Sequence, residues 1–158
     1  MRAVTLRDVE EDDLPVFFRH QRDPVAIRMA AFTAPDPSDR NAFEEHWAKI
    51  LDDDSVITQT IMVADDVVGY VASFVEEGKT EVTYWIDRSR WGQGIASRAL
   101  AEFLGQVTTR PLHARVAKDN AGSLHVLQRC GFTITGEDSG FAHGRGEVVE
   151  EFLLELTT

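Results

Sequence analysis

The spacing of hydrophobic and polar positions first predicts two helices. After a weakly alternating start at 4–7, the acidic stretch DVEEDDLP offers Asp8 as an N-cap and predicts a helix from about Val9 to His20. The two prolines in the segment 34–37 then prevent a helix there, and Ser38 is expected to cap a second helix. The apolar stripe of that second helix is formed by Phe43, Trp47, Ile50 and Leu51, at i, i+4, i+7 and i+8. Core packing is expected for Phe32, Phe43 and Trp47.

Beyond the acidic run at 52–54 the pattern changes to strands. Residues 56–64 and 67–75 flank the turn Asp65-Asp66 as a hairpin, and EVTYWID at 81–87 follows as a third strand. Helical spacing returns at 94–107, with one buried face. That face consists of Ala96, Ala99, Leu100, Phe103, Leu104 and Val107. The remaining elements are a strand at 112–116, a helix at 120–130, a strand at 131–137, a Gly-rich loop at 140–146 and a strand at 146–156.

Length, charge and cysteine content narrow the class of protein. The 158 residues fit one domain spanning 1–158. With 16 Lys and Arg against 27 Asp and Glu, the net charge of −11 disfavours nucleic acid and anionic membranes as partners and favours cationic ligands. No apolar run approaches the roughly 18 residues that cross a bilayer, and the single cysteine, Cys130, cannot form an internal disulfide. We therefore expect a cytoplasmic protein.

The segment YWIDRSRWGQGIASRAL joins a strand to a helix through a glycine-rich turn, Gly92-Gln93-Gly94-Ile95-Ala96. Free backbone N–H groups at a helix N-terminus can hold a pyrophosphate, and glycines let it approach closely. From 87 to 98 three arginines face one aspartate, a local charge of +2. The turn lacks the Lys-Ser/Thr of a Walker A loop and the third glycine of the dinucleotide fingerprint. A nucleotide-binding function is therefore disfavoured, although a simple structural turn stays open as an alternative.

A second segment, DNAGSLHVLQRCGF, favours a functional interpretation of the first. Together the two segments resemble the acetyl-CoA-binding motif and the following Asn-containing helix of the GNAT superfamily of N-acetyltransferases, and they are most similar to the branch of ribosomal-protein N-terminal acetyltransferases. The resemblance spans essentially the whole chain, and its specific part lies at 84–96 and 120–132. It implies a mixed α/β (α+β) fold: a mostly antiparallel sheet, flanked by helices and splayed between the strands 81–87 and 112–116, where acetyl-CoA binds.

The resemblance also implies roles for individual residues. The pantetheine arm of acetyl-CoA would pair with the backbone of Tyr84, Trp85 and Ile86, and Asn120 would contact the arm near the sulfur. The pyrophosphate would lie on the amides of Gly92, Gln93, Gly94, Ile95, Ala96 and Ser97. Trp91 stands where the family usually has Gln or Arg, so it would contribute backbone contacts alone.

The catalytic groups are less fixed by the pattern. Many family members have a Tyr seven residues after the Asn to protonate the departing thiolate, and this chain has Leu127 there. Ser123 resembles the hydroxyl used instead in the ribosomal-protein branch. Glu81 is the candidate base, with a bound water as the competing base and a solvated surface carboxylate as the alternative interpretation of Glu81. Asn120 and Ser123 could equally be an ordinary helix cap and first-turn residue.

The implied activity is acetyl transfer from acetyl-CoA to a primary amine by direct attack in a ternary complex. The acceptor could be a protein N-terminus or a small-molecule amine, and the negative charge favours a cationic one. The alternative is a non-catalytic acyl-CoA-binding or regulatory module. The five histidines show no His-x-x-x-His pair, so no metal is expected. Monomer and homodimer both stay open.

Overall fold

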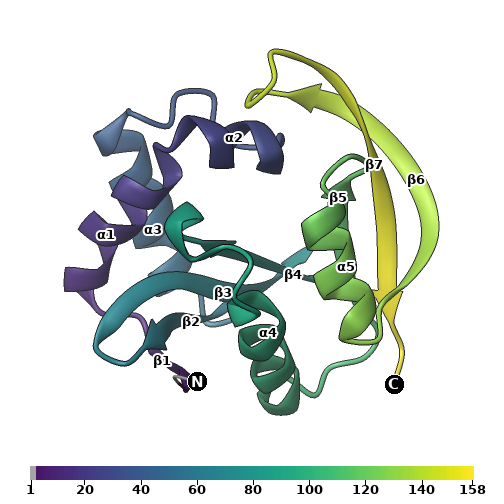
Figure 1. The fold of residues 1–158 in the computed structure, drawn as a ribbon, viewed down its shortest axis with the longest axis horizontal. Coiled ribbons are helices and arrows are strands. Elements are labelled where there is room, and N and C mark those ends of the chain that lie inside the picture. Colours follow the sequence, from purple (N-terminus) through teal and green to yellow (C-terminus); the bar gives the residue numbers. More distant parts are fainter. Residues whose placement is uncertain (1–2) are drawn as a thin grey trace.

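A computed structural model describes residues 3–158 of the protein as a curved sheet with helices on both faces (Figure 1). The strands are β1 (Val4–Asp8), β2 (Ile57–Val63), β3 (Asp66–Glu76), β4 (Lys79–Ile86), β5 (Leu112–Ala117), β6 (Thr133–Ala142) and β7 (Glu147–Leu156). The α-helices are α1 (Leu14–Gln21), α2 (Pro24–Ala30), α3 (Arg40–Asp52), α4 (Ile95–Gln106) and α5 (Ala121–Arg129). Two short 3₁₀ turns, η1 (Glu11–Asp13) and η2 (Arg88–Arg90), complete the elements.

The seven strands form one sheet in the order β1-β2-β3-β4-β5-β7-β6. All neighbours are antiparallel except β4 and β5, which run parallel and pair at a single position, Glu81 opposite His113. Beyond that position the two strands diverge. The mixed α/β, mostly antiparallel, splayed sheet expected from the sequence is therefore confirmed.

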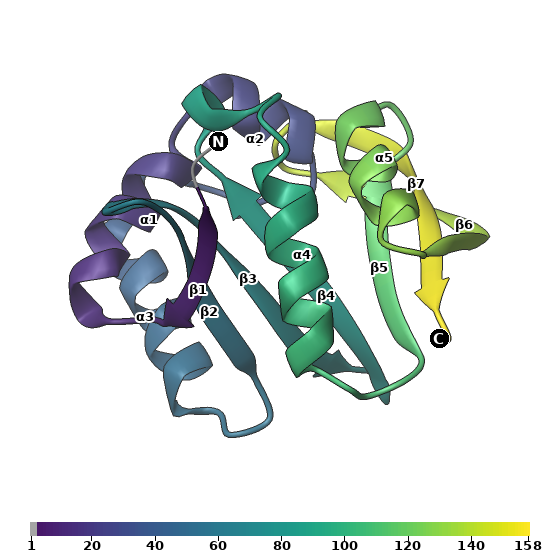
Figure 2. The ribbon, with the colours of Figure 1, turned by 60° about the horizontal axis from the view of Figure 1, so that its bottom comes forward.

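Helices cover the two faces of the sheet unequally (Figure 2). α4 and α5 pack on one face, where the main core surrounds the fully buried Phe103, Phe132 and Leu112. α1 and α3 pack on the opposite face over β2 and β3, through an aromatic cluster that includes Phe17, Trp47 and Tyr70. Among the described helices of residues 3–158, none is long and apolar enough to cross a bilayer.

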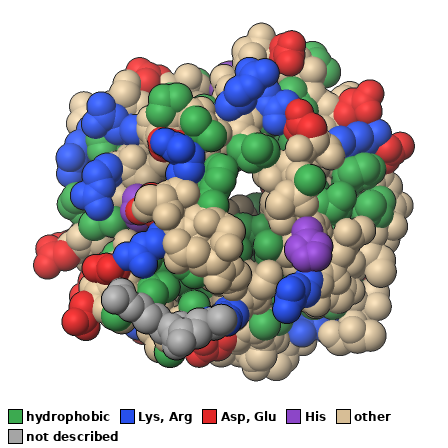
Figure 3. Space-filling model, viewed as in Figure 1, with side chains coloured by type: hydrophobic (Ala, Val, Ile, Leu, Met, Phe, Trp, Pro, Cys, Tyr) green, Lys and Arg blue, Asp and Glu red, His purple; other side chains and the backbone are tan. Residues whose placement is uncertain are grey.

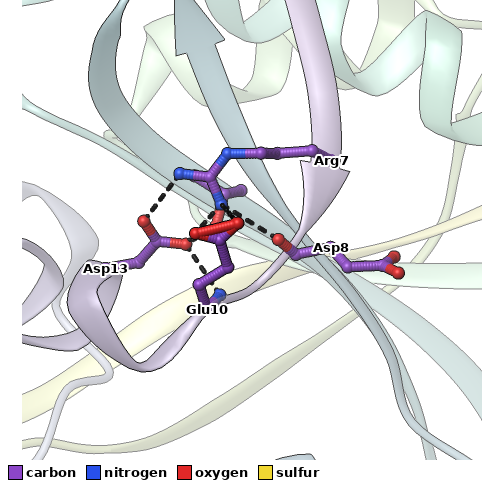
Figure 4. Close-up of polar contacts among 5 residues, drawn as sticks. Arg7, Asp8, Glu10 and Asp13 are labelled. Atoms are coloured by element: carbon purple, nitrogen blue, oxygen red, sulfur yellow. Dashed lines mark hydrogen bonds and ion pairs between the residues drawn. The ribbon is translucent and has the colours of Figure 1, made fainter.

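A buried polar network fixes the connection from β1 to α1 (Figure 4). Arg7 donates two hydrogen bonds to the carboxylate of Asp13, of 2.7 and 2.8 Å. The same carboxylate accepts from the backbone N–H of Glu10 and, at 2.7 Å, from the hydroxyl of the fully buried Thr60 on β2. Hydrogen bonds from these three groups lower the pKa of Asp13 against the opposing effect of its burial.

This network explains why the first helix begins later than the sequence predicted. Asp8 ends β1 and caps nothing, because the chain first makes the turn η1 and α1 begins at Leu14. Pro15 in the first turn of α1 is compatible with that start, since a first-turn residue needs no N–H. The cap predicted at Ser38 was also wrong: Asp39 accepts from the N–H of Ala42.

Three further expectations are corrected. Leu51 is 44% exposed and Phe32 is 39% exposed, so neither belongs to the core, whereas Phe43 and Trp47 are buried as predicted. Leu51 lies in the last turn of α3, which ends at Asp52. The predicted Gly-rich loop is shorter than 140–146, because β6 continues to Ala142 through its pairing with β7.

Candidate active site

The divergence of β4 from β5 creates the candidate active site. Because the strands pair at Glu81 and His113 alone, the backbone of β4 from Val82 onward has no partner on the β5 side. Successive residues of a strand direct their N–H and C=O groups to alternate sides. In the stretch 84–86 the groups that face the slot between β4 and β5, and not β3, are therefore available to an extended ligand, except the Ile86 carbonyl, which accepts from Trp91. In the space-filling view an opening passes through the molecule between α2 and α5 (Figure 3).

The glycine-rich turn stands where β4 leads into α4. Gly92 and Gly94 have φ angles of +77° and +76°, a conformation that side-chain-bearing residues rarely adopt, and a Cβ on either would meet no atom within 4 Å. The space above the turn is therefore open, and the first amides of α4, which begins at Ile95, have no partner within the helix. The indole N–H of Trp91 donates to the carbonyl of Ile86 at 3.0 Å, which fixes the loop.

The local charge of +2 predicted around this turn does not persist in three dimensions. Arg88 donates to Asp23 at 2.7 Å, and Arg90 donates to Asp66 at 2.5 Å. Three arginines therefore face three carboxylates, Asp87 included. Attraction of an anion to this turn depends on the backbone amides and the helix dipole, with Arg98 in the first turn of α4.

Asn120 and Ser123 are joined at the start of α5. The side-chain oxygen of Asn120 accepts from the backbone N–H of Ser123 at 3.2 Å, so Asn120 caps the helix as the conventional interpretation predicted. The same contact fixes the first turn of α5 beside the slot. Leu127, one turn further, is only 2% exposed and belongs to the core.

A hydrogen bond crosses the slot from β4 to α5. The hydroxyl of Tyr84 lies 2.6 Å from the hydroxyl of Ser123, and either oxygen can be the donor. Burial raises the pKa of Tyr84 to about 12, although the hydrogen bond between Tyr84 and Ser123 opposes the shift. Tyr84 is therefore a neutral phenol throughout the neutral pH range. Only a backbone role was expected for Tyr84 from the sequence, but its side-chain hydroxyl is also a polar group of the site.

Glu81 lies at the closed end of the slot and is 7% exposed, so its alternative interpretation as a solvated surface charge is wrong. Burial raises the pKa of its carboxyl, and the opposing effect of Arg115, whose Nε lies 3.4 Å away, is smaller. A carboxylate whose pKa is raised toward neutrality is better suited to accept a proton from an amine. Arg115 also pairs with Glu151 at 2.8 Å and Asp138 at 3.4 Å.

At the slot, these groups lie on the two faces of the sheet. Side chains alternate along a strand, so Glu81 and Trp85 point away from α4 and α5, whereas Tyr84 packs against the main core on their side. The indole N–H of Trp85 is buried and has no hydrogen-bond partner among the described residues. A buried donor without a partner is costly, so this N–H is a candidate to pair with a bound ligand.

α2 spans the open end of the slot. At its start, the capping residue Asp23 holds Arg88 of η2. At its other end, Arg145 of the β6–β7 loop donates to the carbonyl of Arg28 at 2.5 Å and makes two hydrogen bonds to Asp119. A groove of about 390 Å³ follows this junction, a size in the range of ligand sites. Its lining residues are Pro24, Val25, Arg28, Met29, Asp119 and Arg145.

Comparison with known proteins decides the family. The sequence profile of the acetyltransferase (GNAT) domain matches residues 3–133. The chain belongs to the GNAT acetyltransferase family. It is an acetyl-CoA-dependent acetyltransferase, as the resemblance of its two motifs predicted.

Individual relatives of this GNAT acetyltransferase are distant. The uncharacterized N-acetyltransferase p20 of Bacillus licheniformis is 22% identical over 166 residues, which cover 97% of this chain and 92% of p20. The structure of Mycobacterium smegmatis RimJ in complex with CoA-disulfide is 23% identical, with a TM-score of 0.83 over 98% of this chain and 82% of RimJ. Vibrio cholerae spermidine N-acetyltransferase, in complex with CoA and spermine, is 19% identical, with a TM-score of 0.79 over 96% of this chain and 95% of its own.

The structure of this GNAT acetyltransferase brings most of the predicted site residues together around the slot. Ser123 and Asn120 lie on one side of it, and the strand residues 84–86 and the turn 91–97 on the other. Arg115, Arg145 and the Tyr84 hydroxyl went unpredicted. The period-2 alternation of β4 already places Glu81 and Tyr84 on opposite faces, but nothing in the sequence indicates which distant side chains meet them.

Cys130 lies beside the first turn of α4 and is poorly suited to act as a nucleophile. The Cys130 thiol is partly buried, lies 3.6 Å from the carbonyl of Ser97 and has its pKa raised by burial. A raised pKa disfavours the nucleophilic thiolate. Within residues 3–158, no group of three or more His, Cys, Asp and Glu side chains is arranged to hold a metal ion.

Proposed function

We propose that the protein transfers the acetyl group of acetyl-CoA directly to a primary amine, in a ternary complex formed across the slot between β4 and β5. The observation that carries this proposal is that, at the slot, Glu81 lies on one face of the sheet and the Tyr84–Ser123 hydroxyls lie on the other face. An amine can then lose its proton on one face while the sulfur leaves on the opposite face.

In this proposal acetyl-CoA lies along the free edge of β4. Backbone groups of Tyr84, Trp85 and Ile86 hold the pantetheine arm, Asn120 contacts the arm near the sulfur, and the amides of 92–97 hold the pyrophosphate. The open space beside Gly92 and Gly94 supports that placement, since among the described residues no atom beyond the chain neighbours lies within 4 Å of a Cβ placed on either. A free backbone N–H on β4 can stabilise the oxyanion of the tetrahedral intermediate.

The chemical steps need only modest assistance. Glu81, or a water that it orients, takes the proton of the attacking amine. The nitrogen–carbon bond forms, the carbon–sulfur bond breaks, and the electron pair of that bond goes to the sulfur. Burial raises the pKa of the Cys130 thiol, which makes this thiol poorly suited to accept the acetyl group as a nucleophile.

Two properties favour particular acceptors. A protein N-terminus has a pKa near 8 and a lysine side chain one near 10.4, so at neutral pH an N-terminal or other weakly basic amine is more often in its nucleophilic form. Glu81, Glu151 and Asp138 surround the single cation of Arg115, which favours an acceptor carrying positive charge. Both a protein N-terminus and a small polyamine fit, in line with the RimJ and spermidine acetyltransferase structures.

The remaining parts of the proposal concern context. Residues 1–158 act as one acetyltransferase domain in the cytoplasm, without nucleic acid or membrane as partner and without a metal. The net charge of −11 supports the first two exclusions.

Binding and transfer are tested in two steps. A ligand at 100 times its dissociation constant adds about 2.7 kcal/mol to the free energy of unfolding, so acetyl-CoA should raise the melting temperature while ATP and NAD should not. Free thiol is then monitored with acetyl-CoA and a panel of peptides, polyamines and amino acids. Thiol release on addition of an amine supports the enzyme, whereas stabilisation without release under every acceptor would indicate a non-catalytic acyl-CoA-binding module.

A further inference from the structure

We propose that the hydroxyl of Tyr84 acts together with that of Ser123 as a single hydrogen-bond donor to the sulfur that leaves the acetyl group. This inference rests on the proposed acetyl transfer and adds a residue to it. It concerns stabilisation of the departing thiolate. Leu127, at the position where many family members have a Tyr for this task, is buried and carries no hydroxyl.

The geometry supplies one free hydroxyl hydrogen next to the slot. The two oxygens lie 2.6 Å apart, a distance typical of a strong O–H···O bond. The pair has two hydrogens, and this bond uses one of them. Whichever oxygen donates within the pair, the other hydrogen is left for a further acceptor.

Both partners are held in place by the surrounding structure. Tyr84 extends from β4, its ring packs against the main core, and it crosses to α5 where the two strands no longer pair. Ser123 is fixed because its backbone N–H donates to Asn120 in the first turn of α5. The pair therefore bridges the two sides of the slot, along the path proposed for the pantetheine arm.

The chemistry favours hydrogen bonding over full proton transfer. A thiol has a pKa near 8.5, far below that of Tyr84, which is about 12. The phenol therefore does not give up its proton to a thiolate at equilibrium. As the carbon–sulfur bond breaks, its electron pair goes to the sulfur, the hydroxyl pair donates a hydrogen bond to the resulting thiolate, and solvent supplies the proton of the thiol after release.

Three variants and one matched control test the pair kinetically. A hydrogen bond to a charged group is worth enough to change a rate roughly 10- to 100-fold, so Tyr84→Phe should lower kcat by about tenfold and Ser123→Ala by at least as much. In the double variant, kcat should fall by less than the product of the two single reductions, because both substitutions remove the same hydrogen-bond donor. Tyr70→Phe removes the only other phenol of the chain, in the aromatic cluster, and should leave kcat within about twofold.

A spectroscopic measurement on bound CoA separates this role from a structural one. The thiol pKa of CoA is followed by thiolate absorbance in complexes with the wild-type protein and each variant, after subtraction of the CoA-free protein to remove Cys130. A donated hydrogen bond favours the thiolate, so the thiol pKa should be lowered in the wild-type complex and rise by about one unit in the Tyr84→Phe complex. Desulfo-CoA, which lacks the sulfur, should bind both proteins equally well.

The outcomes keep the two proposals apart. If CoA binds and the bound thiol has the same pKa in the wild-type and Tyr84→Phe proteins, with kcat unchanged, the donor pair is overturned while acetyl transfer stands. If desulfo-CoA loses affinity for Tyr84→Phe as much as CoA does, Tyr84 is structural and the inference is also overturned. If the wild-type protein binds no CoA, the proposed function itself fails.

Discussion

Arg145 makes two hydrogen bonds to Asp119, of 2.6 and 2.7 Å, and thereby ties the β6–β7 loop to the residue that precedes Asn120. The same guanidinium donates to the carbonyl of Arg28 at 2.5 Å. The neighbouring Gly144 approaches α2 so closely that a Cβ there would lie 2.4 Å from the carbonyl oxygen of Ile27. These contacts hold α2 and the loop together over the open end of the slot.

Replacing Arg145 should therefore affect substrate binding more than the chemical step. We expect Arg145→Met, which keeps much of the apolar stem, to raise the KM for acetyl-CoA several-fold, with a smaller effect on kcat. The matched control is Arg40→Met, which removes an exposed pair with Glu44 on α3 and should change stability by less than about 1 kcal/mol. Equal KM values for both variants would show that the loop contact does not shape the slot.

The Glu81–Arg115 pair predicts a shift in the pH dependence of activity. The Arg115 charge favours the ionised form of Glu81, so Arg115→Met should raise the pKa of Glu81 further. Of the other charged groups nearby, Glu76 raises the pKa of Glu81, and His113 lowers it to a smaller extent. The acid limb of the kcat/KM profile should therefore move to higher pH.

The measurement is kcat/KM against pH with one fixed amine, whose own titration is common to all variants. Lys118→Met serves as the control, because Lys118 pairs with Glu137 and Glu150 and not with Glu81. Glu81→Gln should abolish the acid limb and lower kcat/KM by roughly 100- to 10,000-fold, the usual contribution of a general base. An acid limb that stays in place in Arg115→Met would assign it to another group.

Two glycine substitutions, one in the glycine-rich turn and one in α4, should differ in their effects on stability and on CoA affinity. Gly94 has a φ of +76°, so Gly94→Ala strains the backbone by roughly 1–2 kcal/mol and should weaken CoA binding through the displaced amides. Gly105 lies within α4 with a Cβ position in open space, so Gly105→Ala should stabilise the protein by roughly 1 kcal/mol and leave CoA affinity unchanged. Calorimetric titration with CoA checks both predictions of affinity. Unchanged affinity in Gly94→Ala would show that the pyrophosphate does not bind at this turn.

His20 predicts a loss of stability in mild acid. Burial lowers its pKa, Arg19 acts in the same direction, and Asp87, 3.7 Å away, opposes them. A histidine with a lowered folded-state pKa takes up its proton first in the unfolded chain, so stability falls as pH drops below about 6.5. His20→Leu should remove most of that loss. His46→Leu should remove less of it, because His46 lies at an exposed site on α3, although burial of its ring also lowers its pKa.

Chemical unfolding between neutral pH and pH about 4.5 measures this effect. The lower end of the range is chosen because Asp13, whose pKa lies below its usual range, begins to lose its own contribution at lower pH. Parallel stability curves for the wild-type and His20→Leu proteins would contradict the prediction.

Local patterns were sufficient for much of this fold. The hairpin of β2 and β3, the strand β4 and the helix α4 follow from period-2 and period-3.6 spacing, and the two motifs of the slot follow from short segments. The start of α1 could not be predicted, because Asp13 is held by Arg7 and by Thr60, which is 47 residues away. The loss of the predicted positive charge at the glycine-rich turn likewise depends on Asp23 and Asp66, which only the fold brings to Arg88 and Arg90.

The active-site side chains show the same division. Asn120 and Ser123 could be identified because they lie within one motif, whereas the Tyr84–Ser123 contact joins residues 39 positions apart. The partner of Glu81, Arg115 on β5, is placed beside it by the order of the strands and also pairs with Glu151 on β7. Side chains that a strand displays are predictable in direction, but their partners are set by topology.

The most direct test of the central claim is a half-reaction experiment. The protein is incubated with acetyl-CoA, first without and then with an acceptor amine, while free thiol, acetylated amine and the intact mass of the protein are followed. Direct transfer across the slot predicts no thiol release and no acetylated protein before the amine is added, followed by equal amounts of thiol and acetylated amine. Release of thiol with an acetyl group retained on the protein before any amine is present would contradict it.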